Sequence, residues 1–187
     1  MIYVRTDYDQ DRKFEVVQPV QFDHRHHVRD DGIDCLYCHS GAENSPFAGV
    51  PATELCMGCH AQIWNDSPLL EPVRQSFYTG KPIRWLRVHK LPDFVYFNHS
   101  VHVHAGLQCK RCHGDVEDMP VVFKKYALTM DFCLDCHRHP ERAVPDYVNT
   151  IASPAPSTGA LRQGRAEQEQ HVPIVTNNLI TCTACHR

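Results

Sequence analysis

The sequence has little of the material from which a large protein core is built. Only 42% of its 187 residues are hydrophobic, and 9 glycines stand against 13 prolines. A chain of this size and composition is not expected to bury one extensive apolar core, so it should contain little regular secondary structure. The formal net charge is −3, and nothing in the charge pattern indicates a nucleic-acid partner.

The sequence also lacks a long apolar run near its start. Residues 1–22 contain no stretch of signal-peptide length and nothing close to the roughly 20 apolar residues of a membrane span. A segment that faces lipid is therefore not expected in this part of the chain.

No cysteine lies outside one repeated pattern, Cys-x-x-Cys-His, which occurs five times. Chance would give only about 0.04 copies in a chain of this composition. Two thiols at this spacing can form thioethers to the two vinyl groups of one haem, and the imidazole that follows reaches the iron. In chain order, the first to fifth motifs supply Cys35, Cys38 and His39; Cys56, Cys59 and His60; Cys109, Cys112 and His113; Cys133, Cys136 and His137; and Cys182, Cys185 and His186.

These motifs predict five covalently bound haems c, which would themselves form the core. The expected fold is a multihaem cytochrome c, with mostly short α-helices and loops wrapped around the haems and little β structure. Zinc sites also use paired cysteines, but they do not need a histidine after every pair. Disulfides do not need the histidine either, and bridges within a Cys-x-x-Cys pair are disfavoured.

A second pattern, Phe-x-His-x-x-His, precedes each of two pairs of motifs. It begins at Phe22 and again at Phe97, 75 residues later, while Cys35 and Cys109 are 74 residues apart. This near-constant offset indicates an internal duplication. We expect a first dihaem module at residues 1–80, a second at 81–145, a linker or arm at 146–170 and a single-haem segment at 171–187.

The histidine count favours iron with two axial imidazoles, because five of the fourteen histidines are proximal and five more ligands would be needed. Histidines three residues apart on one helical turn can serve two closely packed irons. The alternative is that these histidines are solvated on the protein surface and bind no iron. The predicted distal ligands are His24, His27, His99 and His102, with His89 as the fifth; alternatives for the fifth are Met130, His104, His171, Met119, His26 and His139.

Two stretches outside the motifs carry further expectations. Residues 68–77 predict a short helix that ends at Gly80, with Pro82 beyond it. Residues 151–170 show no hydrophobic periodicity, which predicts a linker or an arm that packs on a partner protein. Covalent haem attachment takes place outside the bacterial cytoplasm, so we expect a precursor with a signal peptide or an anchor, and a native N-terminus that the printed chain lacks.

Blocks outside the haem motifs resemble those of one family, the pentahaem cytochrome c subunit of bacterial alternative complex III. The resemblance covers about residues 18–145. It rests on QPVQFDHRHH at 18–27, GIDC at 32–35, FAGVP at 47–51, LLEPVR at 69–74, TGKP at 79–82, RVH at 87–89, LPDFVYFNHS at 91–100 and LTM at 128–130. Members of this family carry an N-terminal membrane helix, which this chain does not show.

The resemblance implies an electron relay on the periplasmic side of the inner membrane. Electrons would come from iron–sulfur and polytopic membrane subunits that oxidise quinol, and would pass to a periplasmic carrier or a terminal oxidase. No catalytic site of its own is expected. The alternatives are a multihaem reductase with an open haem and a free-standing shuttle or quinol dehydrogenase cytochrome. Carbon monoxide binding would reveal the first, and quinol oxidation by this chain alone would reveal the second.

Overall fold

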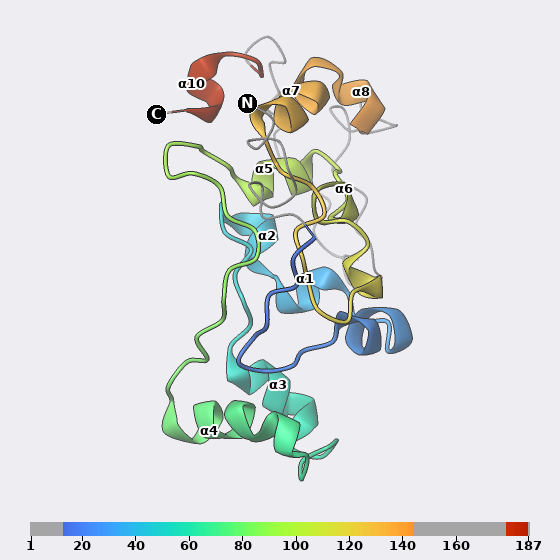
Figure 1. Cartoon of the computed structure of the whole chain (residues 1–187), viewed down its shortest axis with the longest axis vertical. Helices are drawn as coiled ribbons and strands as arrows, with labels where there is room; N and C mark the ends of the chain where they lie inside the picture. The colour runs from blue at the N-terminus through green and yellow to red at the C-terminus, as the bar shows by residue number, and fades with distance from the viewer. Residues whose placement is uncertain (1–12, 144–178, 187) are drawn as a thin grey trace, which may run out of the picture.

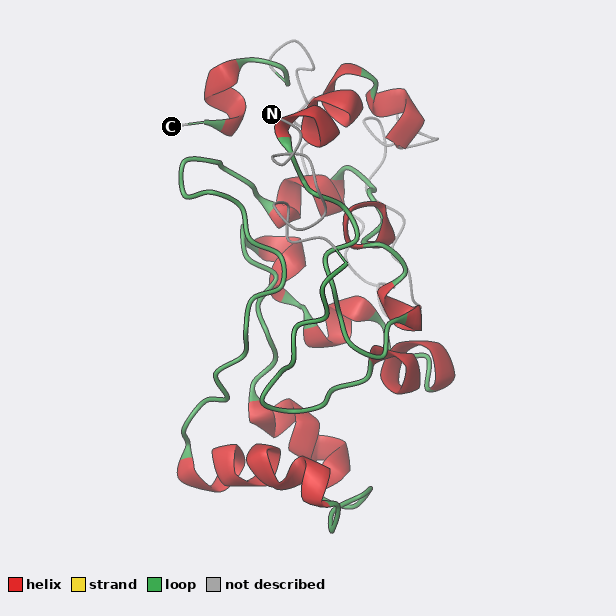
Figure 2. Cartoon of the chain, viewed as in Figure 1, coloured by secondary structure: helices red, strands yellow, loops and turns green. Residues whose placement is uncertain are grey.

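The structure, a computed structural model, describes residues 13–143 and 179–186. Within these ranges short helices alternate with long loops, and no strand is formed (Figure 2). The β structure there consists of two isolated bridges, Glu15 with Phe123 and Val95 with His186. The prediction of short helices with little β structure is confirmed. The arm expected at 146–170 lies outside the described residues, and so does His171.

Every Cys-x-x-Cys-His motif lies on a helix of its own or at the end of one. Within the described ranges no helix is both long and apolar enough to cross a lipid bilayer. The helices are η2 (Arg25–Asp30), α1 (Cys35–Cys38), α2 (Gly41–Asn44), α3 (Thr53–His60), η3 (Pro68–Leu70), α4 (Glu71–Thr79), α5 (His99–His104), α6 (Lys110–His113), η4 (Val116–Asp118), α7 (Met130–Arg138), α8 (Pro140–Ala143) and α10 (Cys182–Cys185).

Local sequence signals set the ends of these helices. The Asp34 side chain accepts a hydrogen bond from Leu36 N at 2.8 Å and caps α1, and Asn98 caps α5 through Ser100 N at 3.0 Å. Helix α4 ends at Gly80, which adopts φ +66°, a left-handed conformation that glycine accepts without strain. The helix predicted between the modules, with its glycine stop, is therefore confirmed.

The protein core is small. Buried hydrophobic side chains in the described part are Val20, Ala42, Met57, Val73 and Met119, and none of the side chains there is less than 2% exposed. Val20, Met57 and Val73 form one cluster. Large hydrophobic side chains elsewhere are exposed to solvent, among them Trp64, which is 63% exposed, and Tyr78, which is 75% exposed. Packing between side chains alone therefore leaves much apolar surface uncovered, as expected of a chain wrapped around bulky cofactors.

The helices are strung along one long axis. Figure 1 places α3 and α4 at one end, α7, α8 and α10 at the other, and α1, α2, α5 and α6 between them. The two predicted dihaem modules, residues 1–80 and 81–145, are called the duplicated segments below. They meet through reciprocal contacts, because α2 packs against α5 and η2 packs against η4. Each histidine helix, η2 and α5, thus touches the segment that follows the first motif of the other copy.

Candidate haem sites

Most histidines of the Cys-x-x-Cys-His and Phe-x-His-x-x-His patterns share one hydrogen-bonding arrangement. In six of them Nδ1 lies within hydrogen-bonding distance of a backbone carbonyl oxygen. A carbonyl only accepts, so Nδ1 carries the proton and Nε2 keeps its lone pair for a metal. The residues present therefore fit haem iron. The pairs are His39 with Gly49 (2.8 Å), His60 with Ile63 (3.0 Å), His137 with Leu179 (2.7 Å), His27 with Asp23 (3.1 Å), His99 with Pro46 (2.7 Å) and His102 with Asn98 (2.7 Å).

Three proximal histidines face a histidine of the Phe-x-His-x-x-His pattern across a similar gap. Ring centroids lie 6.0 Å apart for His27 and His60, 6.3 Å for His99 and His113, and 6.1 Å for His102 and His137; these three pairs belong to the second, third and fourth motifs. Two imidazoles on opposite sides of one metal, with bonds of about 2.0–2.1 Å, place their centroids about 6 Å apart. The observed spacing matches that arrangement.

A phenylalanine packs between the two histidines of each pattern. Phe22 meets His24 edge to face at 4.8 Å and 82°, and stacks on His27 at 4.4 Å and 22°. The second copy repeats this geometry around Phe97, with 4.8 Å and 89°, then 4.5 Å and 27°. The sequence showed the phenylalanine as part of a repeat. The structure shows why it is there: it holds both imidazoles in place.

His24 and His89 each contain a buried ring nitrogen with no hydrogen-bond partner, Nδ1 in His24 and Nε2 in His89. Burial lowers the pKa of His24 to about 4, with a further contribution from His39, and burial lowers the pKa of His89 to about 3, with a contribution from His113. Both imidazoles are therefore neutral at pH 7. The His89 and His113 rings lie 4.3 Å apart, which places His89 beside the third motif.

The other ligand candidates lie in different settings. Met130 opens α7 and is 63% exposed. Met119 is buried at 5%, while His104 is exposed and its Nδ1 bonds the Ser100 carbonyl at 2.7 Å. His26 is exposed and its Nδ1 lies 3.3 Å from Asp30. His139 directly follows the last residue of α7 and is its C-cap.

Cysteines from different motifs lie next to one another in an order that differs from the chain order. All ten are free. A hydrogen bond between Cys35 and Cys109 raises the pKa of the first and lowers that of the second. The first and third motifs are thus in direct contact. Burial raises the pKa of Cys56, and nearby Cys38 raises it further, which places the second motif beside the first.

The remaining motifs continue this series. Burial, with a contribution from Cys136 of the fourth motif, raises the pKa of Cys112 to about 11. Burial also raises the pKa of Cys133, with a contribution from Cys185 of the fifth motif. The spatial order is therefore second, first, third, fourth and fifth. Figure 1 shows the same succession from α3 through α1, α6 and α7 to α10.

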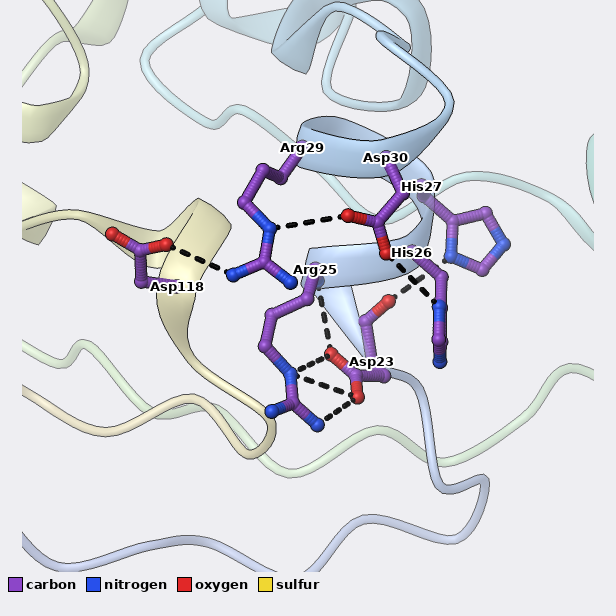
Figure 3. A network of polar contacts seen from close by, with 7 residues as sticks. All are labelled: Asp23, Arg25, His26, His27, Arg29, Asp30 and Asp118. Carbon is purple, nitrogen blue, oxygen red and sulfur yellow. Dashed lines mark hydrogen bonds and ion pairs between the residues drawn. The ribbon is translucent and has the colours of Figure 1, made fainter.

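An ion-pair network stabilises the first histidine helix, η2 (Figure 3). Arg25 contacts the Asp23 carboxylate at 2.6 Å, and its hydrogen bonds lower the pKa of Asp23 to about 2. Arg29 bonds Asp30 at 3.1 Å and reaches Asp118 in η4 at 3.3 Å. This last contact joins the two duplicated segments.

The fifth motif packs on the second duplicated segment. Tyr96 N donates to the Cys185 carbonyl at 2.7 Å, and the Phe94 and His186 rings lie 5.9 Å apart. Just before α10 in the chain, the Leu179 carbonyl accepts a hydrogen bond from Nδ1 of His137 in the fourth motif at 2.7 Å. The fourth and fifth motifs are therefore held together by backbone groups.

Comparisons with known proteins agree with this site. Residues 101–187 match the cytochrome c3 family. Over 175 residues the chain is 30% identical to the multihaem cytochrome c subunit of a menaquinone reductase from Nitratidesulfovibrio vulgaris; this covers 91% of the chain and 77% of that relative.

Proposed function

Because this chain belongs to the multihaem cytochrome c family that includes the menaquinone reductase subunit, we propose that it is an electron relay in a quinol-oxidising membrane complex. The complex proposed is alternative complex III, with the chain on its periplasmic side. The contiguous spatial order of the five motifs carries this proposal. When bound, haem iron supplies reversible one-electron chemistry.

The residues of the chain attach, ligate and orient the proposed five haems. The ten cysteines would form the thioethers, and the five motif histidines would hold the iron through Nε2. Ring spacing supports His27 as the distal ligand of the second motif, His99 of the third and His102 of the fourth. His24 is proposed for the first motif because, after burial, His39 of that motif contributes most to its lowered pKa. His89, whose buried Nε2 has no partner, is proposed as the fifth distal ligand, although its ring lies beside His113 of the third motif, which already faces His99.

The proposed partners follow from the resemblance to the complex. They are iron–sulfur and polytopic membrane subunits on the donor side, and a periplasmic carrier or terminal oxidase on the acceptor side. Paired imidazoles at three motifs support closed coordination, which favours a relay over a reductase with an open haem. A free-standing quinol dehydrogenase cytochrome is the remaining alternative.

The experiment that tests this proposal is gentle detergent extraction of the native membranes, followed by mass spectrometry of the proteins that comigrate with the haem-stained band. We expect a large iron–sulfur subunit and polytopic membrane subunits in the same band. Isolation of the chain alone would contradict the relay subunit and support the free-standing cytochrome.

Substitution His27→Ala tests the assigned distal ligands. We expect one haem to change from low spin to high spin and to bind carbon monoxide stoichiometrically in the reduced protein, because its iron loses one of two axial nitrogens. The neighbouring His26→Ala is the matched control, since the His26 side chain is 60% exposed and pairs with Asp30. Visible and EPR spectra report both. Equal spectra for the two variants would contradict the assignment.

Substitution His89→Phe tests the fifth distal ligand. Phenylalanine fills the buried space beside His113 without offering a nitrogen, so ligation by His89 predicts one high-spin haem among five. The count of low-spin haems by EPR is the measurement. Five low-spin haems in the variant would show that His89 only packs against the third motif.

A further inference from the structure

The loop formed by residues 45–49, called the bracket loop below, contacts histidines of two different motifs. Its Gly49 carbonyl accepts from Nδ1 of His39, the proximal histidine of the first motif, at 2.8 Å. Its Pro46 carbonyl accepts from Nδ1 of His99, which faces the third motif, at 2.7 Å. One short loop therefore orients an imidazole from each duplicated segment.

Backbone contacts lock the bracket loop onto the second segment. His99 N donates to the Pro46 carbonyl at 3.4 Å, and Ser100 N donates to the Ser45 carbonyl at 3.3 Å. These bonds satisfy amides in the first turn of α5, which have no partner inside their own helix. The start of α5 thus sits on the bracket loop, and the position of the His99 ring depends on the position of that loop.

A glycine allows the bracket loop to approach helix α2. A Cβ added at Gly41 would lie 2.6 Å from the Phe47 carbonyl oxygen and 2.8 Å from that of Ala48. Both atoms belong to the backbone, so relief requires the loop itself to move. Within the loop, Ser45 Oγ accepts from Phe47 N at 3.1 Å and fixes its turn.

We propose that the bracket loop is a shared positioning device that sets the ligand strength of His39 and His99 together, and so couples the first and third haems at the junction of the two segments. The inference rests on the proposed axial roles of these histidines. A hydrogen bond from Nδ1 raises the basicity of a ligating imidazole and favours the oxidised metal. Weakening both bonds should therefore raise two reduction potentials in the same direction.

Substitution Gly41→Ala is the test, and Ser40→Ala is its matched control. Ser40 precedes Gly41 at the start of α2, is exposed, and makes no capping hydrogen bond with its side chain. We expect Gly41→Ala to raise two of the five potentials and to shift two low-spin EPR signals, while three stay unchanged. Ser40→Ala should leave all five in place. The variants His24→Met and His99→Met identify which transitions belong to the first and third motifs.

A milder variant keeps the test informative if Gly41→Ala does not fold. Ser45→Ala removes the Oγ acceptor of the turn and should shift the same two potentials by less. A change at one motif only, or at none, with all haems attached and low spin, would overturn the shared role. A different result would contradict the proposed relay function, namely isolation of the unmodified chain without the membrane subunits.

Discussion

Removal of the third motif is expected to divide the reduction of the protein into two phases. In the variant Cys109→Ala with Cys112→Ala, quinol added to the assembled complex should reduce two haems rapidly and two slower by orders of magnitude. The spatial order explains this split, because the third motif separates the second and first from the fourth and fifth. Electron tunnelling falls steeply with distance, so one missing site interrupts the series. Stopped-flow absorbance measures both phases.

The matched control removes a site at the end of the series. In the variant Cys56→Ala with Cys59→Ala, the four remaining motifs stay contiguous, so all should be reduced in one phase. If electrons enter the series at the second motif, this single phase is slow; if they enter at the fifth motif, it is fast. Low-spin spectra of the four remaining haems verify that each variant is intact. A single phase in the variant of the third motif would contradict the deduced order.

The second large effect is expected when the chain is produced without haem. We predict a complete loss of cooperative folding, because the described part contains only five buried hydrophobic side chains and none less than 2% exposed. So small a core cannot offset the conformational entropy of ordering the chain. Cofactor binding then supplies the folding free energy, as metals do in small metal-binding domains.

Production in a cytoplasm that lacks haem attachment, compared with the haem-loaded protein, gives the measurement. Calorimetry should show a thermal transition only for the loaded protein, and amide hydrogen exchange should show protection only there. Reduced cysteines must be maintained throughout, because disulfides between the exposed thiols of Cys35 and Cys109 would complicate the comparison. A cooperative transition in the protein without haem would show that side-chain packing alone suffices.

The sequence predicted those features that side-chain patterns encode. The motifs fell on short helices, and the helix between the modules ended at Gly80 with φ +66°. The Phe-x-His-x-x-His repeat predicted two equivalent sites, and Phe22 and Phe97 show matching contacts with their histidines. These outcomes depend on local spacing and on residue type, which a single sequence displays directly.

The supporting contacts could not be predicted in this way. Pro46 and Gly49 act through backbone carbonyls, which every residue possesses, so their side chains give no signal of the role. The block FAGVP at residues 47–51 contains no cysteine, histidine or methionine, so its sequence gives no sign of a link to haem binding. Its proximity to His39 became visible only in the fold. Gly41 carries a weak signal, since glycine inside a helix is unfavourable and suggests a close backbone approach.

The order of the motifs also depends on packing that sequence spacing does not specify. Chain order would place the first motif at one end of the series. In the fold it lies between two others, because Cys38 is near Cys56 of the second motif and Cys35 contacts Cys109 of the third. Contacts between very short helices decide this arrangement. The position of His89 is similar: the sequence marked it as a ligand candidate, and only the fold shows its ring against His113.

The reciprocal contacts between the duplicated segments have a consequence for the origin of the chain. The second and first motifs followed by the third and fourth form a palindrome, since the first motif corresponds to the third and the second to the fourth. Packing of α2 on α5 is mirrored by packing of η2 on η4. Such reciprocity is the mark of an isologous, two-fold symmetric dimer. A single ancestral module that paired with its own copy would already have had four sites in series, and gene fusion would have made that pairing permanent.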